Sequence, residues 1–286
     1  MSFYFRIFLL LILGIFYTCA YSAELRISSS ELSKKLTNST FIILDSRTFE
    51  DYKISHIPGA LNFPVDLSYE NKQVNGKITS PQAMQKIFRR LGLTSNSPVI
   101  VYDSGDLADA ARLFWVLEVY GIKQVRVLDY GYDHWLNQHY PVTQQIPEVI
   151  PSHYIATINH KRLSSKFTTL LATKNTNQVI VDARPEAAYI GKTSTAKRFG
   201  HIPTAINVPS SHNLAKEDGF SSLKQLNELN RLYNIIPKNK KVIIYCAIGR
   251  VSATNYLALR ELGYDVSNYD ASWKEWGNDF KLPIEK

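Results

Sequence analysis

The sequence is poor in cysteine. Its 286 residues include only Cys19 and Cys246. Cys19 lies in an apolar N-terminal stretch, so a chain that loses this stretch keeps one thiol. One thiol cannot form an intramolecular disulfide, which excludes the disulfide-stapled class of exported proteins. A single cysteine left in an exported protein indicates a free reactive thiol or an intermolecular partner. Without a resolving cysteine, that thiol suits carriage of a chemical group better than dithiol redox chemistry.

Signals for several other function classes are also missing. The seven histidines are scattered, without the paired spacing of metal ligands, so we predict no metal site. No glycine-rich phosphate loop follows a first strand, which argues against nucleotide binding, and we expect no other cofactor. The formal net charge is +8, but Lys and Arg form no dense block. We therefore interpret the charge as general steering of small anions and predict no nucleic-acid site.

Long apolar runs are confined to the N-terminus. Residues 7–17 form an almost wholly apolar run of 11 residues. This is short of the ~20 residues that span a membrane. Small residues such as Ala20 and Ser22 follow at a spacing suited to cleavage. We therefore predict a signal peptide over residues 1–22 and export, in a bacterium to the periplasm. An uncleaved anchor is the alternative, and a lipid on Cys19 is a weaker one.

The rest of the chain is an internal duplication with a period of about 140 residues. Each half contains an Asp-x-Arg motif after an apolar run, then a His-Ile-Pro-x-Ala motif, a second apolar run, and finally a Trp followed by a Pro. The matched positions are 45–47 with 182–184, 56–60 with 201–205, Asp103 with Cys246, Asp129 with Asp270, Trp135 with Trp276, and Pro141 with Pro283. The period is too long for a solenoid, so two globular domains are predicted.

Each half alternates short β-branched runs with helical patterns. The predicted strands are 42–44, 99–102, 125–128, 179–181, 242–245 and 266–269, and the predicted helices are 81–91, 107–119, 222–233 and 252–262. This alternation predicts an α/β fold in which each domain has a parallel sheet flanked by helices on both faces. We expect a first domain over residues 24–144, a linker over 145–164 and a second domain over 165–286.

The stretch around Cys246 carries the chemistry. The apolar run 242–245 predicts a short buried strand ending on Cys246, and a tight turn through Gly249 leads into the next helix. Open α/β sheets bind ligands at the carboxyl ends of their strands. The N–H groups of the turn and the helix start favour negative charge there, and Arg250 adds a positive charge. The site therefore suits an anionic substrate that is attacked by, or carried on, a sulfur.

These motifs together resemble the tandem-domain rhodanese family. The resemblance covers residues 24–286 and implies two tandem rhodanese-like domains. It implies a sulfurtransferase for thiosulfate or 3-mercaptopyruvate, in which Cys246 takes a sulfane sulfur from a small anionic donor and becomes a persulfide. The sulfur then passes to a thiophilic acceptor such as cyanide or a thiol, including a protein thiol. The family's N-terminal domain lacks the cysteine, in agreement with Asp103 at the matching position, so we expect the first domain to be non-catalytic.

The resemblance also assigns roles to residues near Cys246. The loop residues expected to face the thiolate or persulfide through their N–H groups are Ala247, Ile248, Gly249, Arg250 and Val251. Arg184 matches a family arginine that holds the anionic donor. However, Arg47 occupies the same place in the half without a cysteine, so an architectural Asp–Arg pair is the alternative. Arg250 either binds the donor or is a solvated residue, and a cation at a helix N-terminus is locally unfavourable, which favours the functional role.

The loop also bears on the choice of donor. Mercaptopyruvate enzymes of the family carry a hydroxyl two residues after the cysteine, where this chain has Ile248. The bulkier Ala-Ile-Gly-Arg loop resembles the thiosulfate-preferring branch, so thiosulfate is the expected donor and 3-mercaptopyruvate the alternative. A cysteine-dependent phosphatase would need a longer loop before its arginine. The alternative from another class is a non-enzymatic persulfide carrier or protein-docking module. Two domains packed on each other would suffice as a monomer.

Overall fold

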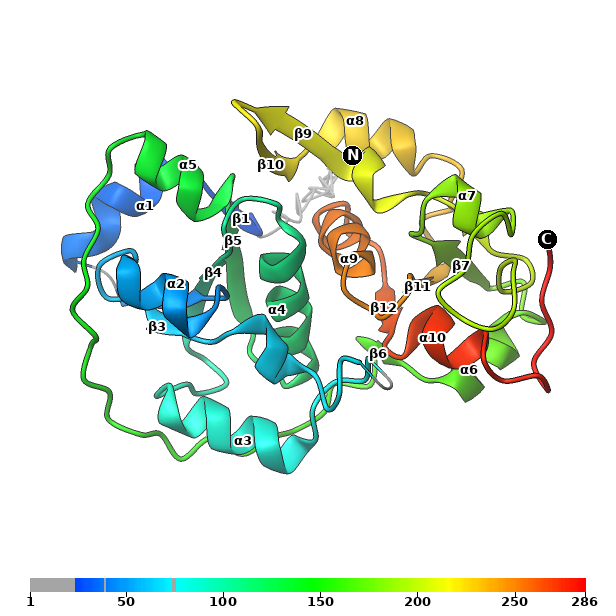
Figure 1. Ribbon diagram of the computed structural model, residues 1–286, viewed down its shortest axis with the longest axis horizontal. Helices are drawn as coiled ribbons and strands as arrows, with labels where there is room; N and C mark the ends of the chain where they lie inside the picture. Colours follow the sequence, from blue (N-terminus) through cyan, green and yellow to red (C-terminus); the bar gives the residue numbers. More distant parts are fainter. Residues whose placement is uncertain (1–23, 39, 74–75) are drawn as a thin grey trace, which may run out of the picture.

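A computed structural model describes residues 24–286 except 39, 74 and 75. The predicted signal peptide, residues 1–22, lies outside the described residues. In the part of the chain that is described, no helix has the length and apolar character needed to cross a membrane. The described chain forms two α/β halves that lie side by side (Figure 1), which confirms the predicted fold class.

The first half contains a parallel sheet in the order β1-β5-β4-β2-β3. Its strands are β1 (Arg26–Ile27), β2 (Ile42–Asp45), β3 (Leu61–Asn62), β4 (Pro98–Tyr102) and β5 (Gln124–Leu128). Its helices are α1 (Ser29–Lys35), α2 (Phe49–Ile54), α3 (Pro81–Arg90), α4 (Ala108–Val119) and α5 (Gly131–Asn137), with 3-10 turns η1 (Leu36–Asn38) and η2 (Val65–Ser68). Neighbouring side chains of a strand point to opposite faces. Ile100 therefore packs with Trp135 of α5, and Val101 packs with Phe114 of α4.

The second half repeats this arrangement with the order β6-β12-β11-β7-β8. Its strands are β6 (Leu163–Ser164), β7 (Gln178–Asp182), β8 (Ile206–Asn207), β11 (Lys241–Tyr245) and β12 (Val266–Tyr269), and a separate hairpin is formed by β9 (Leu214–Glu217) and β10 (Phe220–Leu223). Its helices are α6 (Lys166–Ala172), α7 (Glu186–Tyr189), α8 (Leu226–Leu232), α9 (Ser252–Glu261) and α10 (Ser272–Trp276), with the 3-10 turn η3 (Ser210–Asn213). The equal strand orders agree with the duplication inferred from the sequence.

One predicted helix was wrong at its start. The spacing of leucines predicted a helix over 222–233, but α8 begins at Leu226 and residues 220–223 form β10. Leu223 pairs with Leu214 across the β9–β10 hairpin and is buried there. The hairpin is anchored to the first half, because the Ser221 N–H donates to the Gly105 carbonyl at 2.8 Å. This contact between the halves stabilises β10 over the helix that the leucine spacing predicted for residues 222–225.

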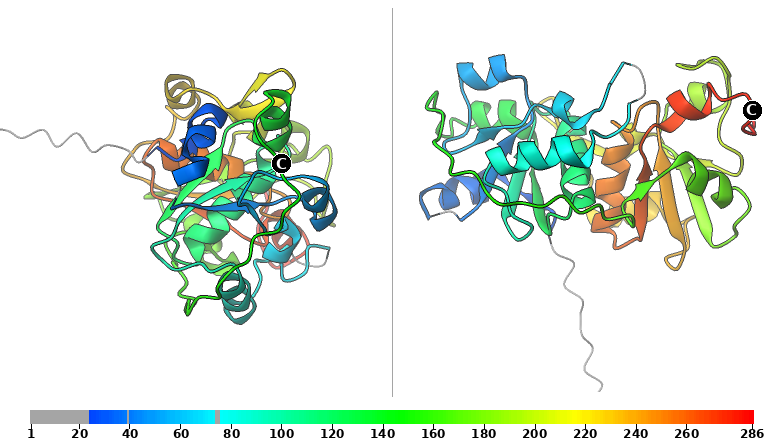
Figure 2. Two further views of the ribbon diagram at one scale, coloured as in Figure 1. Left: turned by 90° about the vertical axis from the view of Figure 1, so that its left-hand side faces the viewer. Right: turned by 90° about the horizontal axis from the view of Figure 1, so that it is seen from below.

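A single apolar core joins the two halves. Helices α4 and α9 lie against each other where the halves meet (Figures 1 and 2). The rings of Phe114 of α4 and Tyr256 of α9 pack at a tilt of 56° with centroids 6.1 Å apart, within one cluster that contains strand residues of both sheets. After α5 the chain runs along the outer side of the first half and enters the second sheet at β6 (Figure 1), at the end of the predicted linker. The halves therefore form one packed unit.

Candidate active site

Cys246 follows β11 at the carboxyl end of the second sheet. Its side chain is 1% exposed. Its backbone N–H donates to the Ser272 hydroxyl at 3.1 Å, and its carbonyl accepts from the Trp273 N–H at 3.0 Å. Ser272 has a φ of 54° at the first position of α10. The start of α10 therefore fixes the backbone that carries the thiol.

In the loop between Cys246 and α9, backbone carbonyls accept hydrogen bonds, whereas backbone N–H groups donate none within the described part of the chain. The Ala247 carbonyl accepts from the Lys274 N–H at 3.0 Å. The Gly249 carbonyl accepts from Arg112 Nη1 at 2.9 Å and Asn268 Nδ2 at 3.2 Å. By contrast, the N–H groups of residues 247–252 have no hydrogen-bond acceptor within the described part of the chain. Such unpaired N–H groups before a helix are the usual components of an anion nest.

Gly249 makes this loop conformation possible. Its φ is +72°, in the left-handed region, and a Cβ added there would come within 2.5 Å of the Asp270 carbonyl. Only glycine fits both the conformation and the close approach. Ala247, Ile248 and Val251 are half-buried around it. The loop predicted from the sequence is therefore tightly packed and directly follows Cys246.

Arg250 bridges the two halves, and its side chain is 29% exposed. Its Nε donates to Asp109 Oδ1 at 2.5 Å, and its Nη2 donates to Asp106 Oδ2 at 3.0 Å. Burial disfavours the guanidinium charge, but the hydrogen bonds and charges of Asp109 and Asp106 outweigh burial and raise the pKa of Arg250. Two carboxylates of the first half thus hold the arginine that follows the cysteine by four positions.

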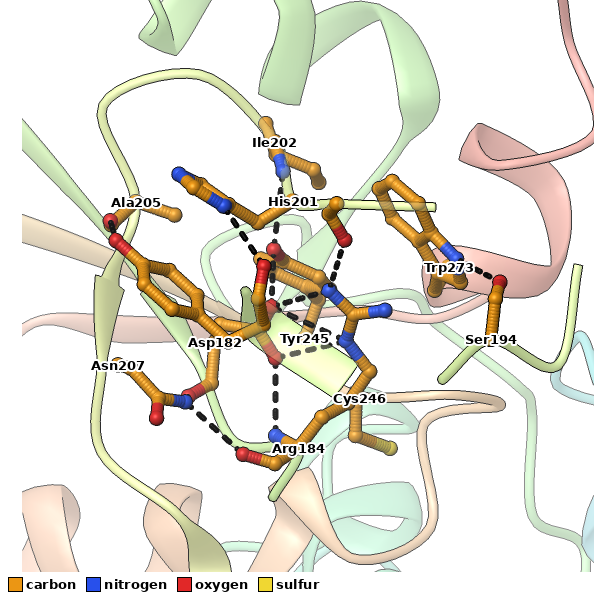
Figure 3. A network of polar contacts seen from close by, with 12 residues as sticks. Asp182, Arg184, Ser194, His201, Ile202, Ala205, Asn207, Tyr245, Cys246 and Trp273 are labelled. Carbon is orange, nitrogen blue, oxygen red and sulfur yellow. Dashed lines mark hydrogen bonds and ion pairs between the residues drawn. The ribbon is translucent and has the colours of Figure 1, made fainter. Parts of the chain in front are cut away.

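Arg184 lies in a buried network with Asp182 (Figure 3). Its Nε and Nη2 bond both oxygens of Asp182, the shortest contact being 2.6 Å, and Nη2 also donates to the Gly200 carbonyl at 2.7 Å. The guanidinium carbon lies 4.3 Å from the centroid of the Trp273 ring. Nη1 is buried and has no partner among the described residues. Asp182 and the Gly200 carbonyl therefore fix the guanidinium of Arg184, and only its Nη1 has no hydrogen-bond partner among the described residues.

The equivalent pair in the first half is almost a copy. Arg47 bonds Asp45 with the same shortest contact of 2.6 Å, and its Nη2 donates to the Ser55 carbonyl. The histidines also repeat: His56 Nδ1 contacts the Tyr52 carbonyl at 2.7 Å, and His201 Nδ1 contacts the Tyr189 carbonyl at 2.9 Å. Because these contacts also occur in the half without a cysteine, they support a structural role for both motifs, while donor binding through the unpaired Nη1 of Arg184 stays a prediction.

The structure adds two buried groups to the site that the motifs did not reveal. Arg112 of α4 is fully buried between the Ser68 hydroxyl and the Gly249 carbonyl. A lone arginine in an apolar helix is the signal that could have identified it. Asp270 follows β12, and its Oδ2 accepts from the Ile78 N–H at 2.5 Å. Burial raises the pKa of Asp270 to about 6, although Arg112 opposes the rise.

The described residues contain no group of three or more His, Cys, Asp or Glu side chains placed to hold a metal ion.

Comparisons with known proteins agree with this geometry. The rhodanese-like domain family matches residues 28–138 and 166–279. The 3-mercaptopyruvate sulfurtransferase of Escherichia coli strain K12 is 31% identical over 250 residues, which cover 84% of this chain and 87% of that protein. The sulfur carrier protein TtuD of Thermus thermophilus is 29% identical over 249 residues, covering 82% and 87%.

A solved structure extends the likeness to three dimensions. The crystal structure of the E. coli 3-mercaptopyruvate sulfurtransferase SseA matches with a TM-score of 0.76 and 28% identity, over 88% of this chain and 99% of that one. Two matched domains, related proteins of nearly the same length and the shared architecture lead to one conclusion: this chain is a member of the rhodanese family of sulfurtransferases, with two rhodanese-like domains in tandem.

Proposed function

We propose that the protein transfers sulfur through a persulfide on Cys246, with thiosulfate as the preferred donor. The observation that carries this proposal is the loop of residues 247–252, whose amides are unbonded while the neighbouring carbonyls are bonded away. An anionic sulfur next to Cys246 would find several N–H donors already oriented and would not have to displace internal partners.

The two half-reactions balance. The Cys246 thiolate attacks the outer sulfur of thiosulfate, the sulfur–sulfur bond breaks, and sulfite leaves with the bonding electron pair. Cyanide or a thiolate then attacks the outer sulfur of the persulfide, and the Cys246 thiolate is restored. Covalent carriage divides a two-substrate transfer into two steps and predicts ping-pong kinetics.

The choice of thiosulfate is supported by the loop side chains. Ile248 provides no hydroxyl to assist a carbonyl substrate, and it is packed so closely that a Cβ at Gly76 would come within 2.9 Å of its Cβ. The E. coli relative is named for 3-mercaptopyruvate, and that donor is the alternative. The near-complete burial of Cys246 favours small donors and acceptors over a protein thiol.

We further propose that the protein is exported and acts as a monomer. The apolar run of residues 7–17 supports export. The core shared by the two halves completes the site within one chain.

The test is intact mass after separate incubation with thiosulfate and with 3-mercaptopyruvate. We expect a gain of ~32 Da, one sulfur atom, that cyanide or dithiothreitol removes. The Cys246→Ser variant, which keeps a side chain of similar size, should gain nothing. Thiosulfate should load the wild-type protein faster than 3-mercaptopyruvate does.

Each other result has a separate meaning. Faster loading by 3-mercaptopyruvate would reverse the donor preference and leave the persulfide mechanism standing. Loading without turnover to cyanide or small thiols would instead support a sulfur carrier. An adduct that persists in Cys246→Ser would place the sulfur on another residue and contradict the mechanism.

A further inference from the structure

A segment of the first half covers the Cys246 loop. It consists of residues 69–73 and 76–78, joined by the antiparallel bridge between Tyr69 and Ile78, and we call it the Tyr69 hairpin. It is held against the second half by the bond from the Ile78 N–H to Asp270 and by the packing of Gly76 on Ile248. Tyr69 itself is 5% exposed. A segment of the first half thus packs against the loop that follows Cys246.

Arg112 fixes the ring of Tyr69. The Arg112 guanidinium carbon lies 3.6 Å from the ring centroid, a close cation–π contact. The same guanidinium donates from Nε to the Ser68 hydroxyl and from Nη1 to the Gly249 carbonyl, each at 2.9 Å. One buried cation therefore ties the ring of Tyr69 to the loop that follows Cys246.

The hydroxyl of Tyr69 is buried but has no hydrogen-bond partner among the described residues. Leaving a buried hydroxyl unpaired is unfavourable, so such groups call for an explanation. Burial raises the pKa of Tyr69, which keeps the phenol protonated, and Arg112, Cys246, Asp109 and Arg250 are the charged or ionisable groups close enough to shift this pKa. The hydroxyl is therefore an unpaired hydrogen-bond donor on a ring that Arg112 links to the loop after Cys246.

The other half offers a natural comparison. Leu214 pairs with Leu223 just as Tyr69 pairs with Ile78, and both pairs are offset by the same number of residues from the two His-Ile-Pro motifs. The half that covers Asp103 thus has an aliphatic side chain where the half that covers Cys246 has a phenol. The hydroxyl occurs only on the side where a thiol is present.

From these contacts we infer that Tyr69 is a donor-binding residue of the active site: its hydroxyl donates a hydrogen bond to the anionic group of the sulfur donor while Cys246 attacks the outer sulfur. Arg112 is a positioning residue that orients the ring. This inference rests on the proposed function and deepens it, because it assigns part of the donor site to the non-catalytic half.

The test is Tyr69→Phe, measured by the concentration dependence of persulfide loading under single-turnover conditions. The donor should be whichever of thiosulfate and 3-mercaptopyruvate loads the wild-type protein faster. We expect the half-saturating donor concentration to rise about 10- to 100-fold, since a hydrogen bond to a charged group is lost. The urea midpoint should stay the same or rise slightly, because the hydroxyl has no partner to lose. The rate of persulfide discharge to cyanide should remain within about twofold.

Tyr52→Phe is the matched control. Tyr52 is also a buried tyrosine of the first half, but its hydroxyl donates to the Ala60 carbonyl at 2.8 Å. This variant should unfold at a lower urea concentration and load sulfur like the wild type. If Tyr69→Phe also loads with unchanged donor dependence, the inference about Tyr69 is wrong and the persulfide mechanism stands. If the wild-type protein loads with neither donor, the proposed function and the inference fail together.

Discussion

The two halves end the same strand with different residues. In the first half, Asp103 follows β4, and its carboxylate accepts from the Gly105 N–H at 2.9 Å and the Ala110 N–H at 3.1 Å. In the second half, Cys246 follows β11, and the loop amides after it are unbonded within the described chain. The amides of one loop bind its own carboxylate, whereas those of the other have no acceptor among the described residues.

The halves also cover each other's loops. The Tyr69 hairpin packs on the loop after Cys246, and the β9–β10 hairpin packs on the loop after Asp103, where a Cβ at Gly105 would lie 3.3 Å from the Phe220 ring. Two aspartates repeat this exchange: Asp270 accepts from Ile78, and Asp129 accepts from the Ser222 hydroxyl. Each half thus covers the loop at the carboxyl end of the other half's sheet.

The largest expected difference between the two loops is chemical. Cys246→Ser should lower the rate of sulfur transfer at least about 1,000-fold, because it removes the nucleophile. Asp103→Asn should leave the rate within about twofold. Steady-state assays with thiosulfate and cyanide would measure both. A large loss in Asp103→Asn, with its fold intact, would contradict the division into catalytic and non-catalytic halves.

The second expected difference is in the pH dependence of stability. Burial, with the charge of Asp106, raises the pKa of Asp103 to about 7 in the folded protein, above the ordinary value of 3.8. The folded state therefore binds more protons between these values, and the free energy of unfolding falls as the pH rises through this window. Asp103→Asn should remove about 2–3 kcal/mol of the stability loss between pH 5 and pH 8. Urea unfolding at both pH values would show this, and an unchanged slope would exclude Asp103 as its source.

A smaller difference separates two arginines that bridge the halves. Arg250 binds Asp109 and Asp106 next to the Cys246 loop, whereas Arg260 binds Glu118 further along α9. Replacing either with Ala should lower the free energy of unfolding by about 1 kcal/mol. Only Arg250→Ala should also raise the KM for thiosulfate, by about tenfold. A fall in kcat with unchanged KM would show that Arg250 does not bind the donor.

The smallest expected difference concerns two turn glycines. Gly76 (φ +64°) meets Ile248 of the Cys246 loop, whereas Gly219 (φ +88°) faces open space. Ala at either position should cost about 1 kcal/mol of stability through left-handed strain. Gly76→Ala should also lower kcat/KM about twofold to fivefold, because it displaces the loop. Equal kinetics in both variants would mean that the Tyr69 hairpin does not position this loop.

The sequence predicted most of the features that the two halves share. Apolar runs such as 242–245 and the paired motifs predicted the main strands, the two halves and the position of Cys246, because local patterning and duplication are both visible in one chain. It did not predict what depends on packing between the halves. Nothing near Tyr69 marks it as part of a site some 177 residues away in the sequence, and Arg250 could not be paired with Asp109 before α4 and α9 were seen to meet. The misplaced start of α8 has the same cause, since β10 is stabilised by contacts with the first half.

The shared core has a consequence for synthesis of the protein. Phe114 of α4 packs in the same cluster as Leu257 of α9, which leaves the ribosome only after nearly the whole chain has been made. Until then, the part of α4 that packs on α9 has no partner, although α4 already packs on its own sheet, and the first half is exposed to misassembly with other nascent chains. A slower rate of translation late in the chain would lengthen that interval. The yield of folded protein in the cell should therefore depend on the arrival of α9 more than on the completion of the first sheet.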